Sequence, residues 1–230
     1  NGKYGYYKQG KGWRMIKNGL EFLLFGTGPV NSTGVEAGAF INPIDQDELA
    51  YIQAFFVPSI YMNSDTIGVI KNDYGMSITT VMTKPKSRGK VTLKSKDPKD
   101  MPVIELNLLK HPEDLKMMIA GQKFFLRVLQ EGALGAKVKE VIIPNTKGLD
   151  DNKLADHCRN FVRTNYHPSG TAKMGADNDK MAVLDSKMRV RGIDNLRVCD
   201  LSAMPNINSG NTAAPAMMLG LRCGDLISNS

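Results

Sequence analysis

Five short runs of β-branched and aromatic residues, followed by one long amphipathic pattern, constrain the fold of this chain more than any other feature. The runs are separated by turns and loops and cover residues 36–41, 51–57, 74–83, 90–94 and 101–106. Runs of this composition and length are typical of β-strands. Because loops rather than helices join them, they predict a mainly antiparallel sheet that buries one face.

Apolar residues at three- and four-residue spacing predict the helices. The clearest helix begins at Pro112 and ends before Gly132. Proline suits a first helical turn, and Glu113 and Asp114 complement the helix dipole there. Further helices are predicted over residues 12–25, 151–163 and 213–227. The last third of the chain is otherwise rich in loops, with short strands expected near Val183 and over residues 195–199.

Composition excludes several classes of protein. The 230 residues are 42% hydrophobic and 23% charged, which is incompatible with an intrinsically disordered chain. No apolar run approaches the roughly 18 residues that suggest a transmembrane helix. The net charge of +7 comes from scattered lysines interleaved with acids, so a nucleic-acid partner is not expected.

The cysteines and histidines do not indicate a metal site. Cys158, Cys199 and Cys223 are an odd number without a C-x-x-C pair, and they are predicted to be reduced core thiols, which weakly favours a reducing, cytoplasmic compartment. The three histidines lie far apart, so no metal is expected. The sequence also lacks a G-x-S-x-G elbow, a G-x-G-x-x-G loop and a P-loop.

The run Asn165-Tyr166-His167-Pro168-Ser169-Gly170-Thr171 carries the first candidate site. Pro168 restricts the backbone of His167, and Gly170 permits a close backbone approach. A histidine held in a rigid loop suits general acid–base catalysis, because imidazole titrates near neutral pH. A histidine that is merely hydrogen-bonded within a turn fits the same residues.

A second candidate site lies between residues 200 and 212. It follows a short predicted strand and leads into the last helix, a position at which polar ligands are often held. Asn211 and Thr212 are placed to cap that helix. A capped helix without a ligand is the simpler interpretation of this pattern.

Taken in order, these motifs resemble the C-terminal half of the glucose–methanol–choline (GMC) family of flavin oxidoreductases. The resemblance covers nearly the whole chain. It rests on Phe25-Gly26-Thr27-Gly28-Pro29, on Pro85-Lys86-Ser87-Arg88-Gly89, on His167-Pro168-Ser169-Gly170-Thr171, and on residues 196–212.

The resemblance implies FAD-dependent oxidation of an alcohol, with proton abstraction at His167 and hydride transfer to flavin N5. His167 and Asn211 match the two catalytic positions of the family. The implied cofactor-binding residues are Asn165, Tyr166, Asp200, Leu201, Asn211 and Thr212. Ala213 departs from the family, because many relatives carry asparagine at this position.

The implied fold class is α+β: a mainly antiparallel substrate-binding sheet with helices, plus the C-terminal part of a Rossmann-like FAD-binding domain. Residues 1–26 would lead in from the FAD domain, residues 27–150 would form the substrate-binding domain, and residues 151–230 would carry the active-site loop. The Rossmann fingerprint that binds the pyrophosphate is absent. We therefore expect an N-terminal FAD-binding segment as partner, which would be the N-terminal half of the same polypeptide, either cleaved from it or described separately.

Two other functions remain open at this stage. A non-redox enzyme on the same scaffold, such as a hydroxynitrile lyase or a flavin photodecarboxylase, could use the same histidine, since fold does not dictate function. A non-catalytic scaffold chain is the other alternative. The sequence identifies neither the alcohol nor the electron acceptor.

Overall fold

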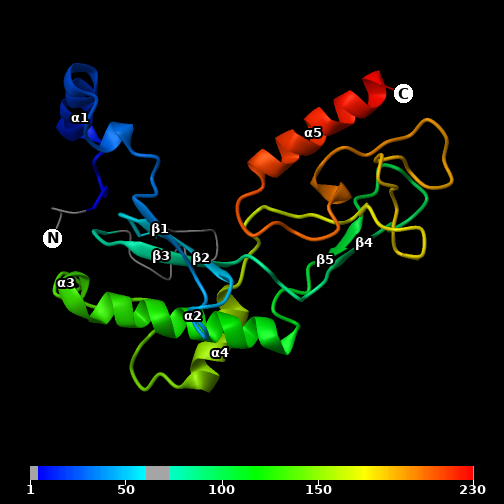
Figure 1. Cartoon of the computed structure of the whole chain (residues 1–230). Coiled ribbons are helices and arrows are strands. Elements are labelled where there is room, and N and C mark those ends of the chain that lie inside the picture. Colours follow the sequence, from blue (N-terminus) through cyan, green and yellow to red (C-terminus); the bar gives the residue numbers. More distant parts are fainter. Residues whose placement is uncertain (1–4, 61–72, 230) are drawn as a thin grey trace. The chain divides into compact units, whose positions relative to one another are not determined.

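The computed structural model describes residues 5–60 and 73–229 and forms two compact units (Figure 1). The first unit takes in Asn1–Val81 and Met117–Leu154, and the second takes in Met82–Lys116 and Ala155–Ser230. Each unit therefore combines two separated stretches of chain. The functional domains predicted over residues 1–26, 27–150 and 151–230 stay a prediction, and residues 1–4 of the first lie outside the described residues.

A three-stranded sheet forms the centre of the first unit. Its strands are β1 (Ala37–Ile41), β2 (Ile52–Val57) and β3 (Ser77–Met82), in the order β1-β2-β3. β1 and β2 run antiparallel, with Ala39 opposite Ala54. The first three residues of β2 are buried, and the Ile52 side chain is fully inaccessible. Ile52 and Ala54 of the central strand thus contribute to the core, whereas its aromatic residues Phe55 and Phe56 are half-buried.

The helix α2 (Pro112–Gln130) covers this sheet along the part that belongs to the first unit (Figure 1). A Cβ on Gly121 would lie 3.3 Å from Cγ1 of Ile52, so the glycine lets the helix approach β2 closely. At the next residue, Nε2 of Gln122 donates a 2.8 Å hydrogen bond to Oγ1 of Thr80 in β3. The short helix α3 (Gly132–Gly135) follows α2.

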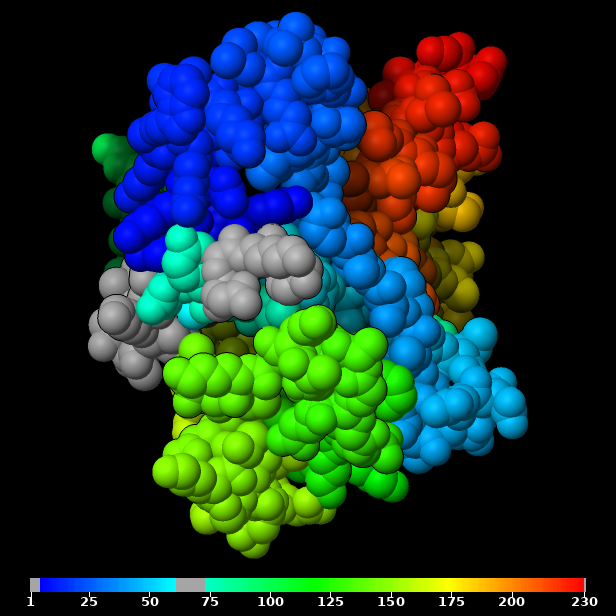
Figure 2. Space-filling view, turned by 90° about the vertical axis from the view of Figure 1, so that its left-hand side faces the viewer, coloured from blue at the N-terminus to red at the C-terminus, as the bar shows by residue number. Residues whose placement is uncertain are grey.

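The helix α1 (Gly12–Phe25) leaves its apolar residues in solvent. It ends at Gly26, whose φ of 64° is left-handed, as at many helix C-termini. Trp13, Leu23 and Phe25 are each more than 70% exposed. Figures 1 and 2 show α1 (blue) and α2 (green) at opposite ends of this unit, and the short 3-10 helix η1 (Pro29–Asn31) follows α1. The apolar face of α1 is therefore unpartnered among the described residues.

The second unit contains few regular elements. A two-stranded antiparallel sheet pairs β4 (Lys90–Thr92) with β5 (Val103–Glu105). α4 (Asp151–Phe161) belongs to this unit from Ala155 onward. The unit also contains the 3-10 helix η2 (Leu201–Ala203) and the final helix α5 (Ala213–Ser228). Met188, Leu219 and Cys223 form its buried core, against which pack Met174, Cys199, Leu201 and Met204. This core joins α5 to the two loops that the sequence singles out.

The predicted fold class, α+β with a mainly antiparallel sheet, is confirmed. The predicted helices and the five predicted strands between residues 36 and 106 all form, within a few residues of their expected ends. No described helix has both the length and the apolar character that crossing a bilayer requires.

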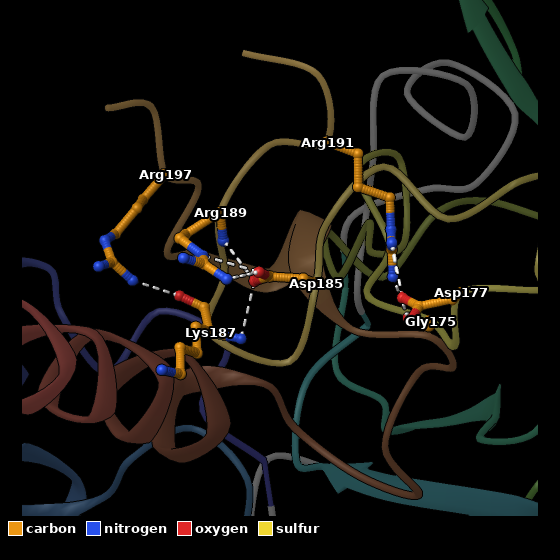
Figure 3. A network of polar contacts seen from close by, with 7 residues as sticks. All are labelled: Gly175, Asp177, Asp185, Lys187, Arg189, Arg191 and Arg197. Atoms are coloured by element: carbon orange, nitrogen blue, oxygen red, sulfur yellow. Dashed lines mark hydrogen bonds and ion pairs between the residues drawn. The ribbon is translucent and has the colours of Figure 1, made fainter. Parts of the chain in front are cut away.

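The prediction of short strands near Val183 and over residues 195–199 is wrong. Single bridges, such as that between Arg189 and Arg197, take their place. The carboxylate of Asp185 accounts for the difference in the segment after Val183 (Figure 3), because its Oδ1 accepts backbone hydrogen bonds from Lys187 (2.8 Å) and Arg189 (3.0 Å). These two N–H groups donate to a side chain within a turn. They therefore do not form the hydrogen bonds to a neighbouring strand that a regular sheet requires.

The expectation of three reduced cysteines is also wrong. Cys199 and Cys223 form a disulfide with their Cα atoms 6.0 Å apart, which ties the segment before Asp200 to α5. Cys158 is the free cysteine and is buried. The two bonded residues are 24 positions apart and belong to different elements, so no spacing motif marks them.

Candidate active site

The loop around His167 is held by backbone hydrogen bonds to η2. Three N–H groups of the loop donate to successive carbonyls of η2: Gly170 to Leu201 (3.2 Å), Ala172 to Ser202 (2.9 Å) and Met174 to Ala203 (2.8 Å). Tyr166 adopts a left-handed φ of 61°, and Gly170 has a φ of 81°. The two candidate segments of the sequence therefore lie side by side, and backbone hydrogen bonds hold the loop on the C-terminal side of His167.

Asp200 shapes the turn that opens η2. Its Oδ1 accepts hydrogen bonds from the backbone N (2.8 Å) and from Oγ (2.5 Å) of Ser202. The Ser202 hydroxyl and then its N–H hold the pKa of the Asp200 carboxyl below its usual value, against a smaller opposing effect of burial. Asp200 thus stays ionised at neutral pH and fixes the position of Leu201, the next predicted cofactor-binding residue.

Asn208 organises the turn before α5 and is not among the site residues predicted from the sequence. Its Nδ2 donates to the backbone carbonyls of Gly210 (2.9 Å) and Asn211 (3.0 Å). Only the amide nitrogen can donate two hydrogen bonds, so the orientation of this side chain is determined. Its Oδ1 is buried and has no hydrogen-bond partner among the described residues. An asparagine two residues before a glycine is typical of such turns, and this was the one signal available.

The imidazole of His167 meets the start of α5. Nδ1 of His167 lies 2.6 Å from Oγ1 of Thr212, the residue at the N-cap of this helix. Thr212 is 5% exposed, whereas His167 is half-buried. Asn211 directly precedes Thr212 and is exposed. The contact brings the two predicted catalytic residues into one neighbourhood although 44 positions separate them in the sequence.

The other predicted site residues lie in the same unit. Asn165 is half-buried, and Tyr166 is 82% exposed beside His167. All seven predicted residues therefore come from three segments of one compact unit: residues 165–167, 200–201 and 211–212.

Charged side chains anchor the far end of the histidine loop. Nζ of Lys173 pairs with Oδ2 of Asp179 at 2.5 Å. In Figure 3 the Arg191 guanidinium points to the end of the loop, where it donates to the Gly175 carbonyl and to Oδ1 of Asp177, both at 2.8 Å. Hydrogen bonds to η2 and α5 thus hold the loop at its centre, and ion pairs hold it at its end.

Known proteins resemble this chain over most of its length. It is 35% identical to an alcohol dehydrogenase (acceptor) of Pseudomonas putida over 87% of this chain and 36% of that protein. It is 34% identical to an oxygen-dependent choline dehydrogenase of Escherichia coli over 94% of this chain and 38% of that protein. The chain thus spans less than two-fifths of these relatives.

Solved structures show the same fold. A formate oxidase variant of Aspergillus oryzae RIB40, studied for its FAD modification, superposes with a TM-score of 0.76 at 23% identity, over 95% of this chain and 42% of that one. Residues 85–220, more than half of the chain, match the GMC oxidoreductase family, and the match includes every predicted site residue. The chain belongs to the GMC oxidoreductase family.

Proposed function

We propose that this chain forms the substrate-binding sheet and the active-site loops of an FAD-dependent enzyme that oxidises an alcohol. The names of the curated relatives, alcohol dehydrogenase and choline dehydrogenase, support this class of reaction. The observation that carries the proposal is the 2.6 Å contact between His167 and Thr212. This contact supports the proposal, because the imidazole lies against the residue that directly follows Asn211 in the chain.

His167 acts as the base in this proposal. An alcohol holds its hydroxyl proton too tightly to lose it unaided, so a base must take this proton as hydride leaves the carbon. This role requires that Nδ1 carry the ring hydrogen and donate it to Oγ1 of Thr212, 2.6 Å away, so that Nε2 takes the substrate proton. The amide of Asn211 donates a hydrogen bond to the alcohol oxygen and stabilises the negative charge that develops there.

The cofactor in this proposal is FAD, which accepts the hydride. The chemistry of the site fits a flavin ring, because the buried Oδ1 of Asn208 lacks a donor among the described residues and a flavin carries a ring N–H. The N–H groups at the start of α5 have no side-chain cap, so they can donate to flavin carbonyl groups. Asn165, Tyr166, Asp200 and Leu201 would supply further contacts to the cofactor.

The rest of the cofactor site would come from an N-terminal FAD-binding segment. This chain lacks the glycine-rich fingerprint that binds the pyrophosphate. The exposed apolar face of α1 supports such a partner, because Trp13, Leu23 and Phe25 would otherwise remain in water. The electron acceptor is left open.

Anaerobic mixing of the full-length, FAD-loaded protein with a panel of alcohols tests the proposal. We expect at least one alcohol to bleach the flavin absorbance. His167→Ala should reduce that rate by roughly 10²–10⁴-fold, the usual contribution of a general base, while FAD stays bound. His157→Ala is the matched control, because this histidine is on α4 and outside the site. Bleaching by no alcohol, or an unchanged rate in His167→Ala, would contradict the proposal and favour a lyase, a photodecarboxylase or a scaffold.

A further inference from the structure

Thr212 occupies a helix N-cap without capping the helix. Threonine at this position usually accepts a hydrogen bond from a backbone N–H of the first turn. α5 has no such side-chain bond, and the Thr212 hydroxyl instead lies 2.6 Å from Nδ1 of His167. The hydroxyl is buried, since Thr212 is 5% exposed. The start of the helix thus gives up an ordinary stabilising contact in favour of one with the imidazole.

The proton on the imidazole decides whether His167 can act as a base. A neutral imidazole carries one hydrogen, on either Nδ1 or Nε2, and the nitrogen without it is the acceptor. If Nδ1 carries the hydrogen, it donates to Thr212 and Nε2 is free to take a proton. If Nε2 carries the hydrogen, the nitrogen that faces away from Thr212 cannot serve as a base.

We propose that Thr212 is the positioning residue of His167: its hydroxyl oxygen accepts the hydrogen of Nδ1 and so keeps Nε2 unprotonated and oriented toward the substrate. This inference rests on the function proposed above. The same contact persists after Nε2 takes the substrate proton, because both nitrogens of an imidazolium are donors. Thr212 therefore holds the ring before and after proton transfer without changing its own charge.

The backbone around His167 supports a positioning role. The hydrogen bonds from the loop to η2 and the left-handed Tyr166 fix where the side chain of His167 starts. They do not fix the rotation of the ring about its own bonds. Oγ1 of Thr212 supplies that remaining constraint, and it comes from a helix that the core residues Leu219 and Cys223 anchor.

Two variants of the full-length, FAD-loaded protein test the inference. Thr212→Val removes the hydroxyl while keeping the shape, and Thr212→Ser keeps the hydroxyl. We expect Thr212→Val to slow flavin reduction by roughly tenfold or more, yet by less than the loss of the base itself. The substrate concentration at half-maximal rate should change little, and Thr212→Ser should recover most of the rate.

The readout that does not depend on activity is nitrogen NMR of protein with ¹⁵N-labelled histidine. His167→Ala identifies the signals of this residue. In the wild type we expect the hydrogen on Nδ1, and in Thr212→Val we expect a mixture of both neutral forms. A hydrogen on Nε2 in the wild type overturns the inference, even if Thr212→Val fails to fold. A Thr212→Ser variant as slow as Thr212→Val also overturns it. Failure of every alcohol to reduce the wild-type flavin would instead contradict the proposed function, and the NMR result would stand separately.

Discussion

Asp114 is buried in the first turn of α2 and fixes the loop that begins the family match. Its Oδ1 accepts a 2.9 Å hydrogen bond from the backbone N of Lys86, and its Oδ2 accepts a 2.7 Å bond from the backbone N of Ser87. Oγ of Ser87 in turn accepts a bond from the N of His111. Asp114 is 3% exposed, so its replacement by alanine should destabilise the protein strongly.

The magnitude follows from the two bonds. A hydrogen bond to a charged group contributes about 1.5–3 kcal/mol. Lys86 is exposed and Ser87 half-exposed, so water can replace part of what their N–H groups lose. We therefore expect Asp114→Ala to lower the free energy of unfolding by about 2–4 kcal/mol. Asp114→Asn keeps one acceptor oxygen but turns an NH₂ group toward the other N–H, so its loss should be about 1–3 kcal/mol.

Glu113→Gln is the matched control. Glu113 is the neighbouring acid, and it forms an ion pair with the side chain of Lys86 in which both side chains are about half exposed or more. Exposed pairs of this kind contribute little to stability, because water screens the two charges. The assay is guanidinium chloride denaturation of the full-length protein, followed by circular dichroism. An Asp114→Ala loss no larger than that of Glu113→Gln would refute the reasoning.

Two more predictions concern titrating groups. Burial raises the pKa of the Cys158 thiol to about 11, so iodoacetamide at pH 8 should label it only after unfolding; rapid labelling of the folded protein, located by mass spectrometry, would contradict its burial. Burial alone would raise the pKa of Asp185, but hydrogen bonds from Arg189 and Lys187 outweigh this effect and lower it. Because the folded pKa lies below the unfolded value of about 3.9, the stabilisation is present above that pH and is lost as the pH falls through the folded pKa. The difference in unfolding free energy between wild type and Asp185→Asn should therefore shrink between pH 6 and pH 3, and a constant difference would count against this network.

Regular elements with their own periodic pattern could be predicted from the sequence. The bounds of α1 agree with the prediction because Gly26 ends an uninterrupted three- and four-residue spacing. The runs that became β1 to β5 were recognisable because β-branched and aromatic residues alternate with turns. The segment around Asp185 could not be predicted in this way, because a side chain there takes hydrogen bonds that a strand would give to its neighbour.

Residue patterns alone predicted the site as two separate loops, and only the family resemblance implied that they form one arrangement. Pro168 and the glycines marked the first loop, and the helix start at Thr212 marked the second. Their hydrogen bond joins positions 45 residues apart, and neither loop has a period that indicates its partner. The disulfide between Cys199 and Cys223 could not be predicted for the same reason. It joins α5 to the segment before η2, and no sequence pattern indicates that these two segments are neighbours.

The loops of the second unit are stabilised without the usual regular elements. Their support consists of the bonds between residues 170–174 and η2, the Arg191 contact with Gly175, and the disulfide to α5. A Thr212 side chain that does not cap α5 forgoes about 1 kcal/mol. Closing a loop of 24 residues by a disulfide contributes about 3 kcal/mol in the chain-entropy account, which more than offsets that loss. The helix that begins at the site can therefore use the hydroxyl of its N-cap residue to orient His167, because the disulfide at Cys223, in the second half of the helix, already holds it in place.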